Sequence, residues 1–382
     1  MKVSGLFAGI GGIELGFAAA GLETILLCEN WLPAAAVLDR NFPSIPRHGD
    51  VADLKFLPDD TEVLTAGFPC QDLSQAGKTL GIAGAQSGLV SHVFRLIDFK
   101  SVPIVVIENV PFMLKLDRGK AMRVLVEAFE ERGYRWAYRI INSLAFVPQR
   151  RERVIFVATN NDLDPSDVLF ADDENAIPTN EGLNTCAHGF YWTEGTRGLG
   201  WAVDSIPPLK KGSTIGIPSP PAILMPNGNV VKPDLRDAER LQGFPVNWTA
   251  AAAEVAPNSI RWSLVGNAVT VPVAKWLGSR LLQPADRAPI LEAPLITGNG
   301  WPRAARGTAG NRVEVRIGSL PKSDRAGSLE DFLLYPGDPL SARATKGFLS
   351  RARKGNLRFR PGFLNQLDRH LCRQESLGLT AV

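Results

Sequence analysis

A cysteine in a polar loop is the residue of this chain best suited to act as a nucleophile. Cys70 lies in the segment GFPCQDLS at 67–74, directly after the apolar run Val63–Ala66. Most free cysteines are small, buried hydrophobic residues, but a loop cysteine near positive charge can be held as a reactive thiolate. Cys70 is therefore a candidate for nucleophilic catalysis.

An acid and two arginines could assist such a nucleophile. Glu108 follows the four apolar residues Ile104–Ile107, so we expect it to be partly desolvated and suited to proton donation. In the segment QRRER at 149–153, Arg151 and Arg153 would point the same way along an extended chain and could bind an anionic or carbonyl-rich ligand. Taken singly, an exposed strand-end acid and a solvated basic edge stay open as alternatives.

The first residues resemble a strand, a glycine-rich turn and a helix, with LFAGIGG at 6–12. Such a turn lets a ligand approach the backbone closely. Glu14 stands where the dinucleotide fingerprint needs its third glycine, which disfavours NAD, FAD and an NAD-dependent oxidoreductase. Glu29 could accept hydrogen bonds from both ribose hydroxyls, and Asp50 from an adenine amino group. Together these residues predict an adenosyl pocket that requires no phosphate.

Strands and helices must place these residues at one edge of a sheet. Short apolar runs alternate with amphipathic stretches over residues 1–160, which predicts an α/β fold with a doubly wound, mostly parallel sheet. Ligands bind such sheets beyond the carboxyl ends of the strands. The predicted strands are Val3–Phe7, Thr24–Cys28, Val63–Ala66, Ile104–Ile107, Trp136–Ile141 and Val154–Ala158, and the predicted helices are Gly12–Ala20, Pro33–Arg40, Leu89–Phe99 and Lys120–Arg132.

The composition changes near Asn160, where Pro, Gly, Asn and Asp become frequent. Helical patterns return at Pro233–Gln242, which Asp234 can cap, and at Ala268–Leu282. We therefore divide the chain into a catalytic domain, a small loop-rich second domain with the segment that follows it, a linker and a small basic module. Their predicted ranges are 1–160 with 262–283, 161–261, 284–310 and 311–382.

The C-terminal part of the chain is its basic part. Residues 284–382 contain 16 lysines and arginines against nine acidic residues, a net charge of +7, so the remainder carries −4 because the whole chain is +3. Basic residues alternate there with apolar ones, which fits a face that lies along phosphates or, equally, a packing element with a solvated outer side. The basic residues in question are Arg351, Arg353, Lys354, Arg358 and Arg360.

The numbers and spacing of cysteines and histidines indicate whether the chain could hold a metal ion or disulfides. The four cysteines are scattered and there are four histidines, so we expect no metal site and no disulfide framework. Free cysteines suit a reducing compartment. The N-terminus lacks the pattern of a signal peptide, and no apolar run reaches the ~18 residues of a membrane span. We therefore expect a cytoplasmic, monomeric protein that does not contact membranes.

With these motifs in hand, the chain resembles the cytosine-C5 DNA methyltransferase family, of the bacterial Dcm-like type. LFAGIGG resembles the family's cofactor loop, GFPCQDLS its nucleophile loop, ENV at 108–110 its acid motif and QRRER its arginine motif. RDAERLQGFP at 236–245 resembles the segment that organises the recognition domain, and GNAVTVPVA at 266–274 the late motif that returns to the cofactor. The resemblance covers nearly all of residues 1–283 in the family's order.

The resemblance implies a role for each matching residue. Cys70 would add to C6 of the target cytosine, with Glu108 at N3 and charge on O2 stabilised by Arg153. Arg151 would support the thiolate or an adjacent phosphate. The implied contacts with S-adenosylmethionine are Phe7, Ala8, Gly9, Ile10, Gly12, Glu29, Asn30, Asp50, Val51, Gly67, Pro69, Asn267 and Val269. The implied contacts with DNA are Gln71, Ser74 and Arg240.

Three positions depart from the family pattern. Gly5 stands where many members have Asp or Ser, which we expect to be tolerated, and Ser87-Gly88 stands where Arg-Gly is frequent. Asn30 occupies the place of an apolar ring that often stacks on adenine, and Trp31 lies one residue beyond. Which of Asn30 and Trp31 covers the cofactor stays open.

The function that follows is methyl transfer from S-adenosylmethionine to C5 of a cytosine flipped out of a specific duplex DNA site. Double-stranded DNA is the expected partner, and a restriction endonuclease for the same site is a further one. The alternatives are an RNA cytosine methyltransferase acting on transfer RNA and a catalytically silent DNA-binding regulator on the same fold. The intact Cys70, Glu108 and Arg153 argue against a silent regulator.

Overall fold

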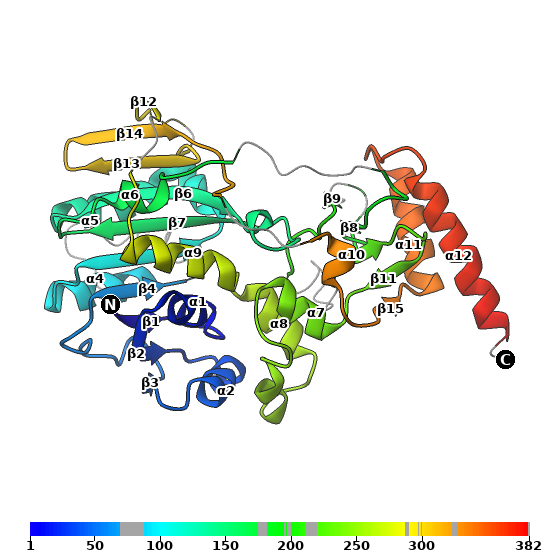
Figure 1. The fold of residues 1–382 in the computed structure, drawn as a ribbon, viewed down its shortest axis with the longest axis horizontal. Helices are drawn as coiled ribbons and strands as arrows, with labels where there is room; N and C mark the ends of the chain where they lie inside the picture. Colours follow the sequence, from blue (N-terminus) through cyan, green and yellow to red (C-terminus); the bar gives the residue numbers. More distant parts are fainter. Residues whose placement is uncertain are drawn as a thin grey trace. The chain divides into compact units, whose positions relative to one another are not determined.

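The computed structural model of the chain divides it into two compact units (Figure 1). The first unit comprises Met1–Asn142, Glu152–Asn175 and Val269–Lys322, and the second comprises Ser143–Arg151, Ala176–Ala268 and Ser323–Val382. The residues that the structure describes are 1–68, 88–174, 182–194, 196, 200–210, 220–286, 290–296, 298, 300–322 and 327–380.

A ten-stranded sheet forms the centre of the first unit, in the order β12-β14-β13-β6-β7-β5-β4-β1-β2-β3. The strands from β3 to β5 are parallel, and the strands from β7 to β12 pair antiparallel. The predicted doubly wound α/β fold is therefore confirmed. The strands are β1 (Lys2–Leu6), β2 (Glu23–Cys28), β3 (Arg47–His48), β4 (Val63–Ala66), β5 (Ile104–Asn109), β6 (Arg135–Asn142), β7 (Glu152–Thr159), β12 (Leu291–Pro294), β13 (Ala304–Thr308) and β14 (Asn311–Arg316).

Helices cover both faces of this sheet. In Figure 1, α1, α6 and α9 lie in front of it, and Gly16 of α1 meets Val271 and Ala274 of α9 so closely that a side chain at Gly16 would collide with them. On the other face, α4 and α5 pack Phe94 and Phe129 into a core that includes residues of β4 to β7. The helices are α1 (Gly12–Ala20), α2 (Leu32–Asn41), α4 (Leu89–Phe99), α5 (Lys120–Glu131), α6 (Pro165–Leu169) and α9 (Val271–Leu282).

The stretch predicted as a linker, 284–310, is instead part of the central sheet. It supplies β12 and β13, and β13 pairs with β6 while β14 pairs with β13. Trp301 is 6% exposed and lies edge-on against Trp136. The prediction was wrong because these strands are short and rich in Ala, Gly and Arg, so they carry no apolar run that a sequence pattern can detect.

The second unit contains a five-stranded antiparallel sheet in the order β15-β11-β10-β8-β9. In the described part of the chain, no helix is long and apolar enough to cross a membrane. The strands are β8 (His188–Phe190), β9 (Ala202–Val203), β10 (Ala222–Leu224), β11 (Val230–Lys232) and β15 (Asp338–Pro339), and the helices are α7 (Leu235–Leu241), α8 (Ile260–Asn267), α10 (Leu329–Phe332), α11 (Ala342–Lys354) and α12 (Phe363–Thr380).

The basic C-terminal residues belong to this second unit and do not form a separate module. Phe348 of α11 and Phe363 of α12 are fully buried against Phe190 of β8. Arg351 donates to the carbonyl oxygen of Trp192 at 2.8 Å. The C-terminal helices therefore complete the hydrophobic core of the unit, as expected for a packing element.

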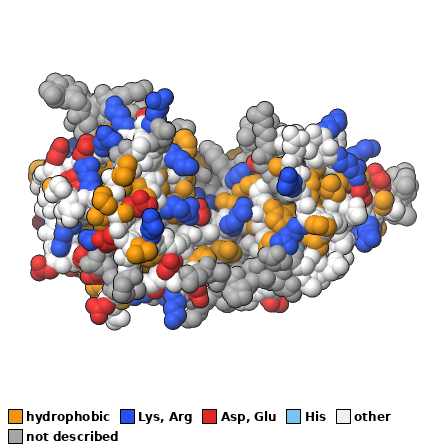
Figure 2. Space-filling view, turned by 90° about the horizontal axis from the view of Figure 1, so that it is seen from above, with side chains coloured by type: hydrophobic (Ala, Val, Ile, Leu, Met, Phe, Trp, Pro, Cys, Tyr) orange, Lys and Arg blue, Asp and Glu red, His pale blue; other side chains and the backbone are white. Residues whose placement is uncertain are grey.

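Charge remains on the outside of these helices. Figure 2 shows more lysine and arginine than acidic side chains over the end of the second unit that α11 and α12 form. Arg353 pairs with Asp368 at 2.6 Å, while Lys354 and Arg358 are exposed. The tail thus combines a buried apolar side with a basic outer side.

Replacing Phe363 with Ala tests the packing role of the tail. Deleting a fully buried phenylalanine should lower the free energy of unfolding by about 3–5 kcal/mol, measured by chemical denaturation of the full chain. Asn365→Ala, an exposed position on the same helix, is the control and should change it by less than about 0.5 kcal/mol. Equal effects of the two substitutions would contradict the packing role.

Candidate active site

The glycine loop after β1 has an unusual backbone that a nearby acid holds in place. Phe7 and Gly9 have left-handed φ angles of 56° and 57°, and Phe7 is a residue type that rarely adopts them. The backbone amides of Gly9 and Trp31 each donate to one carboxylate oxygen of Glu29 at 2.8 Å. Burial raises the pKa of Glu29, and these backbone donors oppose the rise. The carboxyl ends of β1 and β2 are thereby joined at one acidic residue.

The surroundings of Glu29 fit an adenosyl group. A Cβ at Gly9 would meet nothing within 4 Å, so there is open space above the loop. Asp50 is exposed beyond the end of β3, and its Oδ1 accepts from the amide of Ala52 at 2.9 Å. Val51 is buried, and Asn30 is exposed. Two acids, Glu29 and Asp50, thus lie beyond the ends of the neighbouring strands β2 and β3.

The nucleophile loop lies outside the described residues, which stop at Phe68 and resume at Gly88. The predicted roles of Pro69, Cys70, Gln71 and Ser74 therefore stay predictions. The start of the loop is anchored, because the Asn109 side-chain amide donates to the carbonyl oxygen of Phe68 at 2.9 Å. This bond ties the end of β4, which leads into the loop, to the end of β5.

Cys28, at the end of β2, is a poor alternative nucleophile. Burial raises the pKa of its thiol to about 12, and the nearby carboxylates of Glu29 and Asp50 add to the rise. A thiol with that pKa supplies almost no thiolate at neutral pH. The thiol of Cys28 therefore has the environment of a buried structural residue.

Glu108 and Arg153 form an ion pair at the centre of the site. Glu108 is on β5 and Arg153 is on the neighbouring strand β7, and Glu108 Oε1 lies 2.8 Å from Arg153 Nε. Their side chains are 13% and 18% exposed. A Cβ at Gly67 would lie 3.6 Å from Glu108 Oε2, so the second carboxylate oxygen faces the end of β4. An acid and a guanidinium are thus fixed side by side, near the start of the loop that carries Cys70.

Arg151, which the sequence analysis assigned to the thiolate or to an adjacent phosphate, binds backbone carbonyls in this structure. It belongs to the second unit, is 1% exposed and donates to the carbonyl oxygens of Leu209 at 3.1 Å, Gly266 at 3.2 Å and Ala268 at 2.8 Å. A guanidinium bonded to three backbone carbonyls organises the chain around it. These contacts give Arg151 a structural role, and its predicted contact with a thiolate or a phosphate stays a prediction.

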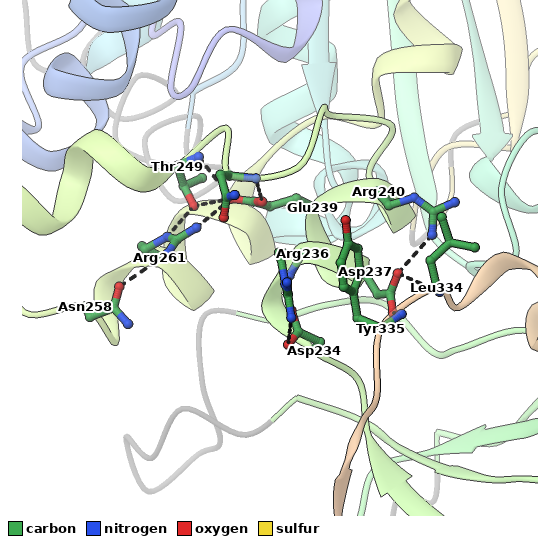
Figure 3. Close-up of polar contacts among 11 residues, drawn as sticks. Asp234, Arg236, Asp237, Glu239, Arg240, Thr249, Asn258, Arg261, Leu334 and Tyr335 are labelled. Carbon is green, nitrogen blue, oxygen red and sulfur yellow. Dashed lines mark hydrogen bonds and ion pairs between the residues drawn. The ribbon is translucent and has the colours of Figure 1, made fainter.

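Arg240, predicted to contact DNA, is likewise engaged within the second unit. It forms an ion pair at 2.9 Å with Asp237, which is fully buried (Figure 3). It also donates to the carbonyl oxygen of Phe332. Asp237 accepts in addition from the amides of Leu334 at 3.1 Å and Tyr335 at 2.9 Å. Arg240 and Asp237 thus connect α7 to the segment after α10, and the predicted contact of Arg240 with DNA stays a prediction.

A second buried acid on α7, Glu239, connects this helix to α8 and to the segment before it. Glu239 is fully buried and pairs with Arg261 of α8 at 3.2 Å (Figure 3). It also accepts from the backbone amide of Thr249 at 2.9 Å. The motif RDAERLQGFP therefore fixes the core of the second unit through its charged residues. Asn267 is exposed at the end of α8 and Val269 is half-buried, and their predicted cofactor contacts stay predictions.

Glu14 is a residue of the site that the sequence analysis did not assign. It lies in the first turn of α1, its side chain is 1% exposed, and its Oε2 has no hydrogen-bond partner among the described residues. A side chain at Gly5 would collide with Glu14 Oε1, so the absence of a side chain at Gly5 makes room for this carboxylate. Burial raises the pKa of Glu14 to about 7, and the charge of Glu29 adds to the rise. The available signal was its helical face, which it shares with the buried Phe17 three residues later.

Comparisons with known proteins agree with this geometry. A model of the C-5 cytosine-specific DNA methylase family matches residues 1–197. The Type II methyltransferase M2.BsuMI of Bacillus subtilis (strain 168) is 45% identical over 98% of this chain and 99% of its own length. The Type II methyltransferase M.BsuFI of Bacillus subtilis is 34% identical over 48% of this chain and 46% of its own length. The crystal structure of the S. pombe Dnmt2 methyltransferase superposes with a TM-score of 0.53 at 18% identity, over 74% of this chain and 99% of that one.

The chain belongs to the C-5 cytosine-specific DNA methylase family. The predicted family and the predicted enzyme class, a DNA cytosine-C5 methyltransferase, are confirmed by the family match and by the relative that is 45% identical. The Dnmt2 structure, at its low identity, supports the fold alone.

The buried carboxyl of Glu14 predicts a pH dependence of stability. Its pKa is about 7 in the folded chain against 4.5 for a free side chain, so the folded state binds the extra proton between these values and stability falls as pH rises from about 4.5 to 7. In the Glu14→Gln variant, the free energy of unfolding should no longer show the drop of roughly 2–4 kcal/mol that this group causes in wild type over that pH range. Denaturation at pH 5 and pH 8 checks this, with the exposed Glu23→Gln as control. An identical pH dependence in wild type and Glu14→Gln would contradict it.

Proposed function

We propose that the protein transfers a methyl group to C5 of a cytosine that is extruded from a specific duplex DNA site, through a covalent bond between Cys70 and C6. The observation that carries the proposal is the ion pair between Glu108 and Arg153, at 2.8 Å and largely buried. An acid beside a guanidinium matches the two polar positions of a cytosine ring that become charged when a nucleophile adds to it. Family membership supplies the substrate class.

The chemistry assigns one task to each of three side chains. The Cys70 thiolate forms a bond to C6, which places negative charge on the ring and makes C5 nucleophilic. Glu108 holds a proton at N3, and Arg153 donates to O2, so both stabilise the charge that develops. After C5 has gained the methyl group, it loses its proton and the sulfur–C6 bond breaks, which restores the aromatic ring and the thiolate.

S-adenosylmethionine, when bound, would supply the methyl group as an electrophile. Glu29 would bind the ribose hydroxyls with its carboxylate, and Asp50 would accept from the adenine amino group. The open space above Gly9 supports this position for the adenosyl group. The family resemblance also assigns cofactor contacts to Phe7, Ala8, Ile10, Gly12, Asn30, Val51, Gly67, Pro69, Asn267 and Val269, and these assignments are part of the proposal.

The target cytosine must leave the helix, because C6 is not accessible inside a duplex. Gln71 and Ser74, in the loop of Cys70, would line its path. The second unit would read the DNA sequence in the major groove, where base pairs are distinguishable. M2.BsuMI and M.BsuFI are named Type II methyltransferases, so a restriction endonuclease for the same site is the partner we propose.

Base-resolution sequencing of DNA treated with the protein and S-adenosylmethionine tests the function directly. Wild type should produce 5-methylcytosine in one short sequence of duplex DNA and none in transfer RNA. Cys70→Ser should lower the rate by more than about 100-fold and leave the affinity for the cofactor within about twofold, measured by calorimetry. Methylation of transfer RNA alone would favour the RNA enzyme, and substantial activity of Cys70→Ser would exclude the covalent step.

A further inference from the structure

A short segment that follows β5 displays three cations next to the proposed active site. β5 carries Glu108 and ends at Asn109, and a tight helical turn, Pro111–Leu114, follows with Met113 and Leu114 buried. After this anchor the chain forms the segment 115–120, which we call the cationic turn. Lys115, Arg118 and Lys120 are all exposed there, as is Asp117.

The backbone of the cationic turn is strained. Asp117, Arg118 and Gly119 have consecutive left-handed φ angles of 48°, 56° and 83°. This conformation costs roughly 1–2 kcal/mol for each residue that has a side chain. Strain of this kind persists only where the surroundings impose it, and it is found most often at binding and catalytic sites.

Trp301 supplies the contacts that impose this backbone. Its amide donates to the carbonyl oxygen of Leu114 and its indole Nε1 to that of Gly119, both at 2.9 Å. A Cβ at Gly119 would lie 2.9 Å from the Trp301 ring, so the glycine allows the ring to pack against the backbone. The side chains of Lys115, Arg118 and Lys120 take no part in these contacts.

The three cations differ from most other basic residues of the first unit. Among the described residues, none of them has an ion pair or a side-chain hydrogen bond. By contrast, four other arginines of the first unit pair with acids: Arg132 with Asp98 at 2.6 Å, Arg303 with Glu152 at 2.6 Å, Arg306 with Glu292 at 2.8 Å and Arg312 with Glu130 at 2.6 Å. Three unpaired cations held on a fixed backbone form a site for an anion, not a solvated edge of balanced charge.

The position of the turn identifies the anion. It begins seven residues after Glu108, at the carboxyl end of the same strand, which is the edge where substrates of such sheets bind. A duplex that places a cytosine at Glu108 brings the flanking phosphates to this edge. We propose that Lys115, Arg118 and Lys120 bind phosphates of the duplex beside the extruded cytosine. This inference rests on the proposed function. Contacts with phosphates would increase the affinity for DNA and would not select the sequence that is methylated.

Matched pairs of substitutions test the inference. Lys115→Gln with Lys120→Gln removes two charges from the turn, and Lys55→Gln with Lys275→Gln removes two exposed, unpaired lysines from elsewhere in the described part of the first unit. Binding of the full chain to the duplex that it methylates is measured by fluorescence anisotropy at several salt concentrations. The turn variant should bind roughly tenfold more weakly, and the slope of log K against log salt should fall by ~1.8, because each lost phosphate contact removes ~0.9.

Arg118→Asn extends the series, since asparagine tolerates the left-handed backbone. It should lower the slope by a further ~0.9. Affinity for S-adenosylmethionine and the methylated sequence should stay those of wild type, and the control pair should bind DNA as wild type does. A turn variant with an unchanged slope, or a control pair with an equal loss, would overturn the inference. If wild type methylates no duplex DNA, the proposed function fails instead, whatever the variants do.

Discussion

The ion pair between Glu108 and Arg153 is the interaction on which the proposed chemistry depends. Two opposite charges that are mostly removed from water attract each other more strongly than they would at the surface, but each would be costly to bury alone. β5 and β7 run antiparallel side by side, and this pairing brings the two residues within 2.8 Å. The pair is therefore in place before any substrate arrives, which is the condition for stabilising a transition state without rearrangement.

Buried charge also organises the second unit, with a different result. Asp237 and Glu239 are fully buried on α7, and Arg240 and Arg261 neutralise them while backbone amides satisfy the remaining oxygens. Such a network contributes little net stability compared with apolar packing, but removing one partner leaves a buried charge unpaired. The network joins α7 to α8 and to the segment after α10, so that chain segments far apart in sequence form one core.

Local patterns predicted most of the first unit. The apolar runs of β1, β2 and β4 to β7 and the periodic faces of α1 and α4 are readable in sequence because burial determines the pattern. Glu108 and Arg153 could also be selected from sequence as candidates, since strand ends in such sheets collect functional residues. Their catalytic roles remain part of the proposal. What sequence could not provide was the identity of distant partners. Arg151 and Arg240 matched functional motifs, yet their guanidinium groups bind carbonyls and acids of the second unit.

The remaining differences between prediction and structure also arise from partners that lie far away in the sequence. β12 and β13 carry too few apolar residues to predict a strand. β13 forms against the edge of β6, and β12 pairs with β14 further out in the sheet. The basic tail was predicted as a separate module because its core partners, such as Phe190, lie more than 150 residues earlier. Glu14 was missed because its effect depends on the missing side chain of Gly5, nine residues before it and on another element.

The covalent bond between Cys70 and C6 is the central claim, and trapping it is the most direct test. A duplex with 5-fluorocytosine at the methylated position should stop the reaction after methyl transfer, because fluorine cannot leave C5 as a cation. Mass spectrometry of the denatured complex should then find the nucleotide attached to the peptide that contains Cys70, only when S-adenosylmethionine is present. Efficient methylation of the ordinary duplex with no such adduct on the fluorinated one would contradict the account.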